Sequence, residues 1–194
     1  MLEQLKDYRI ILASNSPRRK ELLAGLGIPF EVKTLPGIDE AYPDTLNPSE
    51  VAEYISREKA NAYADRMEDD ELLITADTIV VSGDEIMGKP ENAADACRML
   101  HRLSGTVHQV YTGVTLTTLN MQRSFTAATD VRFAKLTDEE VNYYVETFRP
   151  FDKAGAYGIQ EWIGYVGVES IHGSYFNVMG LPIQRLYQEL KKIK

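Results

Sequence analysis

The sequence contains a single cysteine, Cys97, so the chain can form neither an internal disulfide nor a cysteine-based metal site. Cys97 falls within a helical pattern, where we expect a small buried residue. No apolar run is long enough to span a bilayer, and the first residues, MLEQLKDYR, lack the features of a signal peptide. These absences favour a cytoplasmic protein with no membrane segment.

Positive charge is also scarce. The 194 residues carry 21 basic and 29 acidic side chains, which gives a net charge of −8. This balance argues against a broad basic surface that binds nucleic acid. It is compatible with a small anionic ligand, provided that basic side chains gather locally or a metal ion neutralises the ligand.

Several common catalytic motifs are missing. There is no Walker A motif and no GxGxxG, which excludes the P-loop and dinucleotide-binding classes. There is also no GxSxG, HExxH or paired CxxC. The three histidines, His101, His108 and His172, lack metal-ligand spacing, so we expect them to be structural or surface residues.

The apolar patterning predicts a series of short strands and amphipathic helices. Strands are expected over residues 10–13, 30–34, 72–81, 85–90, 107–119, 125–133 and 164–171. Helices are expected over residues 17–26, 47–66, 92–103, 137–148 and 183–190. Asn47 with Glu50, and Thr137 with Glu140, have the spacing of capping boxes at two of these helices.

The stretch ILASNSPRRKELLAGLG places two arginines in the first turn of a helix. Ser16 is the predicted N-cap and Pro17 the first helical residue. Arg18 and Arg19 then add positive charge to a helix end that is already positive, an arrangement that an incoming anion would stabilise. Strand, polar turn and helix start form a known type of phosphate cradle. The alternative, two solvated surface arginines, stays open.

Two charged residues interrupt apolar patterns. Lys59 occupies a place in the stripe of Val51, Ile55 and Tyr63, so it either extends to solvent along its stem or meets an anion in a cleft. In the strand LLITADTIVV, Asp77 is followed by Thr78. A carboxylate there is costly to bury unless it is paired, metal-bound or open to an active site. A paired structural aspartate is the alternative interpretation.

The remaining candidates lie in loops. They are the acidic pair Asp39 and Glu40, Lys89 at the end of a hairpin, and Gln160 at the end of the glycine-bearing stretch PFDKAGAYGIQ. That stretch could let backbone approach a ligand closely, although ordinary turn formation explains it too. Together, the cations, carboxylates and amide suit a phosphorylated ligand bound with a divalent metal, with one carboxylate available to activate water.

Five ordered motifs, SNSPRRKELL, ADTIVV, GKP, DKAGAYGIQ and GSYFNVMGLP, resemble those of the Maf family of nucleoside triphosphate pyrophosphatases. The resemblance covers essentially the whole chain. It implies an α/β fold in which a long twisted mixed β-sheet is flanked by helices, similar to inosine triphosphate pyrophosphatase. It also implies one domain over residues 1–194, with two lobes and a central cleft for the nucleotide, and a homodimer.

The resemblance also implies residue roles. Asp77 matches the catalytic proton acceptor, and with Glu40 it is the expected ligand of a divalent cation, Mg²⁺ or Mn²⁺. The positions matching substrate-binding residues are Ser14, Arg18, Arg19, Lys59, Thr78, Lys89 and Gln160. Of these, Arg18, Thr78 and Gln160 match positions linked to choice of the base. Asn15 stands where the family commonly has a smaller residue.

The identities of Thr78 and Gln160 are similar to those of the branch that prefers dTTP and UTP. The expected reaction is hydrolysis of these nucleotides to the nucleoside monophosphate and pyrophosphate, with a role in cleansing the nucleotide pool and in arrest of cell division. The alternatives are a pyrophosphatase for 7-methyl-GTP or another modified nucleotide, and a nucleotide-sensing regulator of cell division. A phosphosugar-binding module is a further alternative.

Overall fold

The computed structural model describes residues 2–193 and divides into two compact units. Unit 1 contains the described residues of Met1–Asp77, Thr112–Ala127 and Gly180–Lys194, and unit 2 contains Thr78–Tyr111 and Ala128–Met179. The expected single domain with two lobes and a central cleft stays a prediction. No helix in the described part of the chain has both the length and the apolar character needed to cross a membrane.

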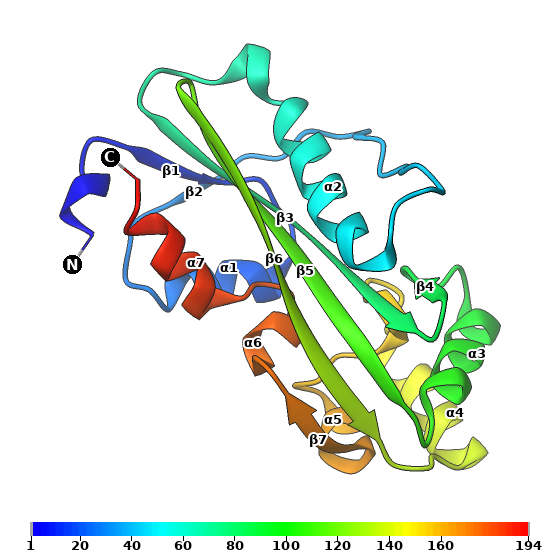
Figure 1. Cartoon of the computed structure of the whole chain (residues 1–194). Helices are drawn as coiled ribbons and strands as arrows, with labels where there is room; N and C mark the ends of the chain where they lie inside the picture. The colour runs from blue at the N-terminus through cyan, green and yellow to red at the C-terminus, as the bar shows by residue number, and fades with distance from the viewer. Residues whose placement is uncertain (1, 194) are drawn as a thin grey trace. The chain divides into compact units, whose positions relative to one another are not determined.

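Seven strands form a mixed sheet in the order β2-β1-β3-β5-β6-β7, with β4 paired to β3 off this path (Figure 1). β1 is parallel to β2 and β3, while β4 is antiparallel to β3 and β7 is antiparallel to β6. The strands are β1 (Arg9–Leu12), β2 (Glu31–Val32), β3 (Glu71–Ser82), β4 (Glu85–Met87), β5 (Val107–Thr118), β6 (Met121–Phe133) and β7 (Val168–His172). The expected α/β fold with a long mixed sheet and flanking helices is confirmed.

Unit 1 carries three α-helices, of which α2 packs on the sheet through a core cluster formed by Ile11, Ala60, Tyr63 and Leu73. Its helices are η1 (Glu3–Leu5), α1 (Pro17–Ala24), α2 (Pro48–Asn61), η2 (Ala64–Arg66) and α7 (Ile183–Leu190). The two ends of the chain meet here, because the side-chain amide of Gln4 donates to the carbonyl of Leu190 over 3.1 Å.

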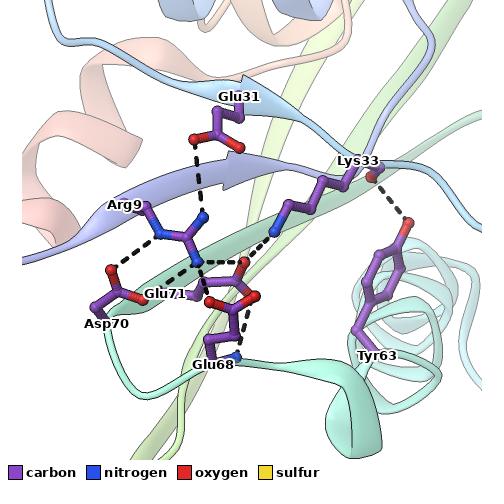
Figure 2. Close-up of polar contacts among 7 residues, drawn as sticks. All are labelled: Arg9, Glu31, Lys33, Tyr63, Glu68, Asp70 and Glu71. Carbon is purple, nitrogen blue, oxygen red and sulfur yellow. Dashed lines mark hydrogen bonds and ion pairs between the residues drawn. The ribbon is translucent and has the colours of Figure 1, made fainter.

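A cluster of charges ties together the first residues of the unit 1 strands (Figure 2). The guanidinium of Arg9 lies among the carboxylates of Glu31, Glu68, Asp70 and Glu71, at 3.9, 2.7, 2.9 and 3.3 Å. Lys33 also binds Glu71, whose side chain is buried. The hydrogen bond from Arg9 lowers the pKa of Asp70. Since these residues belong to or adjoin β1, β2 and β3, the cluster fixes the edge of the sheet.

Unit 2 packs its helices around an aromatic core. The helices are α3 (Ala93–Leu103), α4 (Asp138–Phe148), η3 (Ala154–Ala156), α5 (Trp162–Gly167) and α6 (Tyr175–Val178), with α3 against α4. The rings of His108, Phe133 and Tyr157 meet edge to face, with centroids 5.0–5.4 Å apart. Burial lowers the pKa of His108 to about 4. The expectation that His108 is structural is therefore confirmed.

The predicted helix starts are confirmed because they depend on neighbours in the sequence. Ser16 Oγ accepts from the N–H of Arg19 over 3.4 Å. At α2, the N–H of Asn47 donates to the Glu50 carboxylate over 3.1 Å. At α4, the N–H of Thr137 donates to the Glu140 carboxylate over 2.8 Å, and the N–H of Glu140 donates to Thr137 Oγ1 over 3.2 Å.

Three local predictions were wrong. The strand expected over residues 164–171 begins only at Val168, because the residues before it form the helix α5. A Cβ at Gly164 would lie 1.8 Å from the carbonyl oxygen of Ile159, so this close approach requires a glycine. The second helix, expected to about Arg66, ends at Asn61 and is followed by the separate turn η2. Cys97 is only half-buried, with its thiol 3.7 Å from the Asn142 side chain on the facing helix α4.

Candidate active site

The turn from β1 to α1 is held by its own serines and by Arg19. The buried Ser14 accepts a hydrogen bond from the N–H of Ser16 over 3.2 Å. The Arg19 guanidinium donates to the carbonyls of Gly180 and Ala76, each over 2.8 Å. Two backbone carbonyls therefore fix its position, and Arg19 is not a solvated surface arginine.

The same guanidinium lies in the field of three other charged candidates. Burial is the main cause that lowers the pKa of Arg19, and the positive charge of Arg18 acts in the same direction. The carboxylates of Asp77 and Glu40 oppose the shift. A cation that has lost hydration in this way gains from a further negative charge, such as a phosphate.

The helix α2 is docked on the sheet by close contacts that set its position. A Cβ at Gly113 in β5 would lie 2.3 Å from the backbone of Ala52, so the absence of a side chain permits this approach. Ser56 Oγ and Thr115 Oγ1 share a hydrogen bond of 2.8 Å. Thr75 Oγ1 donates to the carbonyl of Ser56 over 2.6 Å. These contacts fix α2 against both β3 and β5.

This docking directs Lys59 toward Asp77. Lys59 lies one helical turn after Ser56, and Asp77 lies two residues after Thr75, on the same face of β3. Lys59 Nζ is 2.6 Å from Asp77 Oδ1 and 2.8 Å from Glu40 Oε1. The Lys59 and Asp77 side chains are only 14% and 13% exposed, whereas that of Glu40 is 50% exposed. Lys59 thus meets anions instead of extending to solvent.

The two carboxylates could hold a divalent cation. One oxygen of each carboxylate contacts Lys59 Nζ, so Asp77 and Glu40 can bind the same cation. Carboxylate oxygens are ligands that Mg²⁺ and Mn²⁺ prefer. Within residues 2–193, no three histidine, cysteine, aspartate or glutamate side chains gather as a metal site. The donor chemistry of this pair fits a divalent cation.

The other three candidates belong to unit 2. Thr78 is half-buried in β3, and Lys89 is exposed just after β4. The Lys89 segment is bonded to the loop that carries Gln160, because the N–H of Gly155 donates to the carbonyl of Gly88 over 3.0 Å. Unit 1 thus brings together Ser14, Arg18, Arg19, Glu40, Lys59 and Asp77, while unit 2 holds Thr78, Lys89 and Gln160.

Gln160 has a buried hydrogen-bond acceptor without a partner. It occupies the third position of a turn in which the N–H of Glu161 donates to the carbonyl of Gly158 over 2.9 Å. The Tyr165 hydroxyl donates to the backbone carbonyl of Gln160 over 3.1 Å. The side-chain Oε1 atom is buried and has no hydrogen-bond partner among the described residues. Such atoms are uncommon because an unpaired buried acceptor costs free energy.

Sequence reasoning missed the polar residues that surround this turn. Tyr144, Lys153 and Glu161 form a buried network in unit 2. Burial, together with the hydrogen bond to Glu161, raises the pKa of Tyr144. The helix expected over residues 137–148 contains Tyr144 but gave no sign of this contact. A lysine within the small-residue loop DKAGAYGIQ was the one available signal for Lys153.

The loop glycines serve close packing within the protein. Gly155 has a φ of +67°, and a Cβ there would lie 2.8 Å from a methyl carbon of Val80. A Cβ at Gly158 would lie 2.8 Å from the Glu161 carboxyl carbon. Both contacts are within unit 2, so each of these glycines is explained without a ligand.

Comparison with known proteins gives a consistent result over the full chain. The family model described as Maf-like protein matches residues 9–193. A dTTP/UTP pyrophosphatase of Phocaeicola vulgatus is 65% identical over 193 residues, which cover 100% of both chains. The protein of the same name from Bacteroides thetaiotaomicron is 61% identical with the same coverage, and that from Christiangramia forsetii is 43% identical over 98% of this chain and 97% of its own. This chain therefore belongs to the Maf family.

Proposed function

We propose that this chain is a nucleoside triphosphate pyrophosphatase that hydrolyses dTTP and UTP to the nucleoside monophosphate and pyrophosphate. The observation that carries the proposal is the convergence of the Asp77 and Glu40 carboxylates on Lys59 Nζ, at 2.6 and 2.8 Å, in the field of the half-buried Arg19. The names of relatives that are 43–65% identical over nearly all of this chain support the choice of nucleotides.

The cations serve the triphosphate. Arg19 presents a guanidinium already oriented by two carbonyl groups, so little side-chain freedom is lost on binding. Arg18, Lys59 and Lys89 add positive charge, and Ser14 lines the turn before α1. Fixed cations of this kind stabilise most strongly the charge that grows on phosphate oxygens in the transition state.

Asp77 acts as the base. Its carboxylate accepts a proton from a water molecule while the water oxygen forms a bond to the α-phosphorus. The bond between that phosphorus and the oxygen bridging to the β-phosphorus breaks, and pyrophosphate leaves with the electron pair. Lys59 binds Oδ1 and holds the carboxylate in place, so we assign proton acceptance to its other oxygen.

A divalent cation belongs to the proposal. Asp77 and Glu40 would hold Mg²⁺ or Mn²⁺, which supplies charge neutralisation for the triphosphate when bound.

Gln160 and Thr78 select the base. The Gln160 Oε1 atom lacks a donor among the described residues, and N3–H of uracil or thymine is a donor of the required kind. A site that pairs a specific base edge rejects bases whose polar atoms would stay unpaired. We further expect a homodimer in the cytoplasm, with no nucleic acid or membrane partner.

The test is pyrophosphate release from dTTP, UTP, CTP, dATP, GTP and 7-methyl-GTP, measured with Mn²⁺, with Mg²⁺ and with a chelator. We expect metal-dependent release from dTTP and UTP that exceeds release from CTP and the purines by at least about a hundredfold in kcat/KM. A preference for 7-methyl-GTP would mean that this nucleotide, and not dTTP or UTP, is the substrate. If folded protein released pyrophosphate from none of the nucleotides, the result would favour a nucleotide-sensing regulator.

A further inference from the structure

A partly buried ionic network lies next to the turn that carries Gln160. The Lys153 side chain is only 9% exposed, and its Nζ atom is 2.7 Å from Asp152 Oδ1 and 3.1 Å from Glu161 Oε1. The second oxygen of Glu161 accepts a hydrogen bond from the Tyr144 hydroxyl. One carboxylate thus joins a lysine of the loop to a tyrosine of α4.

The same tyrosine also holds the start of the turn. Its hydroxyl oxygen accepts a hydrogen bond from the N–H of Gly158 over 3.0 Å. Glu161 closes the turn by donating its own N–H to the carbonyl of Gly158 over 2.9 Å. Tyr144 and Glu161 therefore restrain both ends of the four-residue turn, and Gln160 lies between those ends.

Gly158 is what permits this arrangement. A Cβ there would lie 2.8 Å from Glu161 Cδ and 3.0 Å from Lys153 Cε. A side chain at position 158 would push the carboxylate and the lysine away from the turn. The loop is thus built so that buried polar groups pack directly against its backbone.

Rigidity at this point matters for telling uracil from cytosine. Uracil and thymine present N3–H as a donor and O4 as an acceptor, whereas cytosine presents N3 as an acceptor and N4–H₂ as a donor. A glutamine amide can pair with either edge if it turns by 180°. Selectivity against cytosine therefore requires that the amide keep one orientation, with Oε1 toward the base.

We propose that Tyr144, Lys153 and Glu161 are positioning residues that hold the backbone of the turn over residues 158–161, and thereby place the Gln160 side chain where its Oε1 atom accepts from N3–H, and so set the preference for uracil and thymine over cytosine. The inference rests on the proposed function. It differs from an ordinary stabilising role because it links these buried residues to discrimination between two bases, and not to turnover in general.

The test is Tyr144→Phe, assayed with UTP and CTP. The matched control is Tyr143→Phe, which removes a hydroxyl from the neighbouring, exposed position of the same helix. We expect Tyr144→Phe to lower kcat/KM for UTP about tenfold, mainly through KM, with CTP hydrolysis changed less than about twofold. Tyr143→Phe should match the wild type with both nucleotides.

A second pair of variants separates positioning from folding. Glu161→Gln keeps an acceptor for the Tyr144 hydroxyl, whereas Glu161→Ala removes it, so the UTP to CTP ratio should be largely retained in the first and fall about tenfold in the second. Thermal unfolding shows whether each variant is folded at the assay temperature.

The outcomes are distinguishable. If the wild type prefers UTP but Tyr144→Phe and Glu161→Ala lower UTP and CTP hydrolysis equally, or change neither, the inference is overturned and the proposed function stands. If the wild type itself does not prefer UTP to CTP, the proposed substrate choice is wrong and the inference falls with it.

Discussion

Each unit contains a buried lysine between two carboxylates, and the two lysines are held differently. Lys59 in unit 1 binds Asp77 and the half-exposed Glu40, so water or a ligand can reach one side of the pair. Lys153 in unit 2 binds the exposed Asp152 and the half-buried Glu161, whose other oxygen accepts a hydrogen bond from the Tyr144 hydroxyl. Each lysine therefore has one exposed carboxylate partner, and the difference is that both oxygens of Glu161 are bound by protein donors, which fixes the second arrangement.

The physical chemistry of the two sites therefore points to different uses. Charges that stay accessible act on a substrate, because their interaction energy changes when a phosphate or metal ion arrives. Charges that are fully paired in the interior contribute little net binding but specify one conformation, and removing one partner leaves the other buried and unpaired. Variants in unit 1 should thus lose turnover, and those in unit 2 should lose stability or selectivity.

The largest expected effect comes from Asp77→Asn. The amide keeps the size of the side chain but cannot accept a proton from water, so kcat should fall by about a thousandfold or more. Pyrophosphate release from dTTP measures kcat, and circular dichroism checks the fold. Asp65→Asn, at an exposed position of unit 1, is the matched control and should keep wild-type turnover. Turnover within tenfold of the wild type in Asp77→Asn would remove Asp77 from the role of base.

Replacing each buried lysine by methionine tests the comparison directly. Lys59→Met should lower kcat/KM for dTTP about a hundredfold, because a cation on the triphosphate is lost. Lys153→Met should instead lower the free energy of unfolding by about 2 kcal/mol, because the half-buried Glu161 loses one of the two donors that bind it. Urea unfolding and initial rates separate the two effects, with Lys135→Met at an exposed position as control. If both variants changed kcat/KM and the free energy of unfolding to the same extent, the two lysines would not have different roles.

Local sequence signals predicted the elements well where the deciding contacts are close in sequence. Asn47 and Glu50 are three residues apart, so the start of α2 could be predicted from that pair alone. The apolar run of β3 predicted a strand buried on both faces, and its two half-buried positions are Asp77 and Thr78. The helix α5 was missed because its conformation depends on contact between Gly164 and the backbone of Ile159.

The sequence indicated which residues are candidates for the site, but not which of them form ion pairs with one another. Lys59 was out of place in an apolar stripe, which left extension to solvent and an anionic partner as the two interpretations. The pairing of Lys59 with Asp77 and Glu40 depends on how α2, β3 and the loop before α2 pack against one another. The network of Tyr144, Lys153 and Glu161 joins residues 8 and 17 positions apart, with no local pattern to signal it. Long-range contacts of this kind are set by the tertiary fold.

Gln160→Leu examines the selective side of unit 2. Leucine keeps a similar volume but supplies no acceptor for N3–H, so kcat/KM for dTTP and UTP should fall about fiftyfold. Most of the change should be in KM, and the value for CTP should rise or stay constant. Steady-state kinetics with the three nucleotides measure this. An equal fall for CTP would show that Gln160 does not select the base, and Gln109→Leu in β5 is a control for the substitution itself.

The smallest expected effect concerns the stability of the closed core of unit 2. Burial lowers the pKa of His108 from 6.5 to about 4, so the unfolded chain binds a proton more readily than the folded one between these values. Stability from this group is fully present above pH 6.5 and is lost as the pH falls toward 4. Between pH 7 and pH 5 the loss should be about 2 kcal/mol.

Urea unfolding at the two pH values measures this difference in the wild type and in His108→Phe. The variant keeps a ring against Phe133 and Tyr157 but has no group that titrates, so its stability should fall by about 2 kcal/mol less over the same interval. It will also be less stable at pH 7, because the Tyr157 hydroxyl loses the partner that it has at 2.8 Å. His172→Phe, at a highly exposed position, should keep the wild-type pH dependence. An identical pH dependence in His108→Phe and the wild type would mean that His108 is not held neutral by the core.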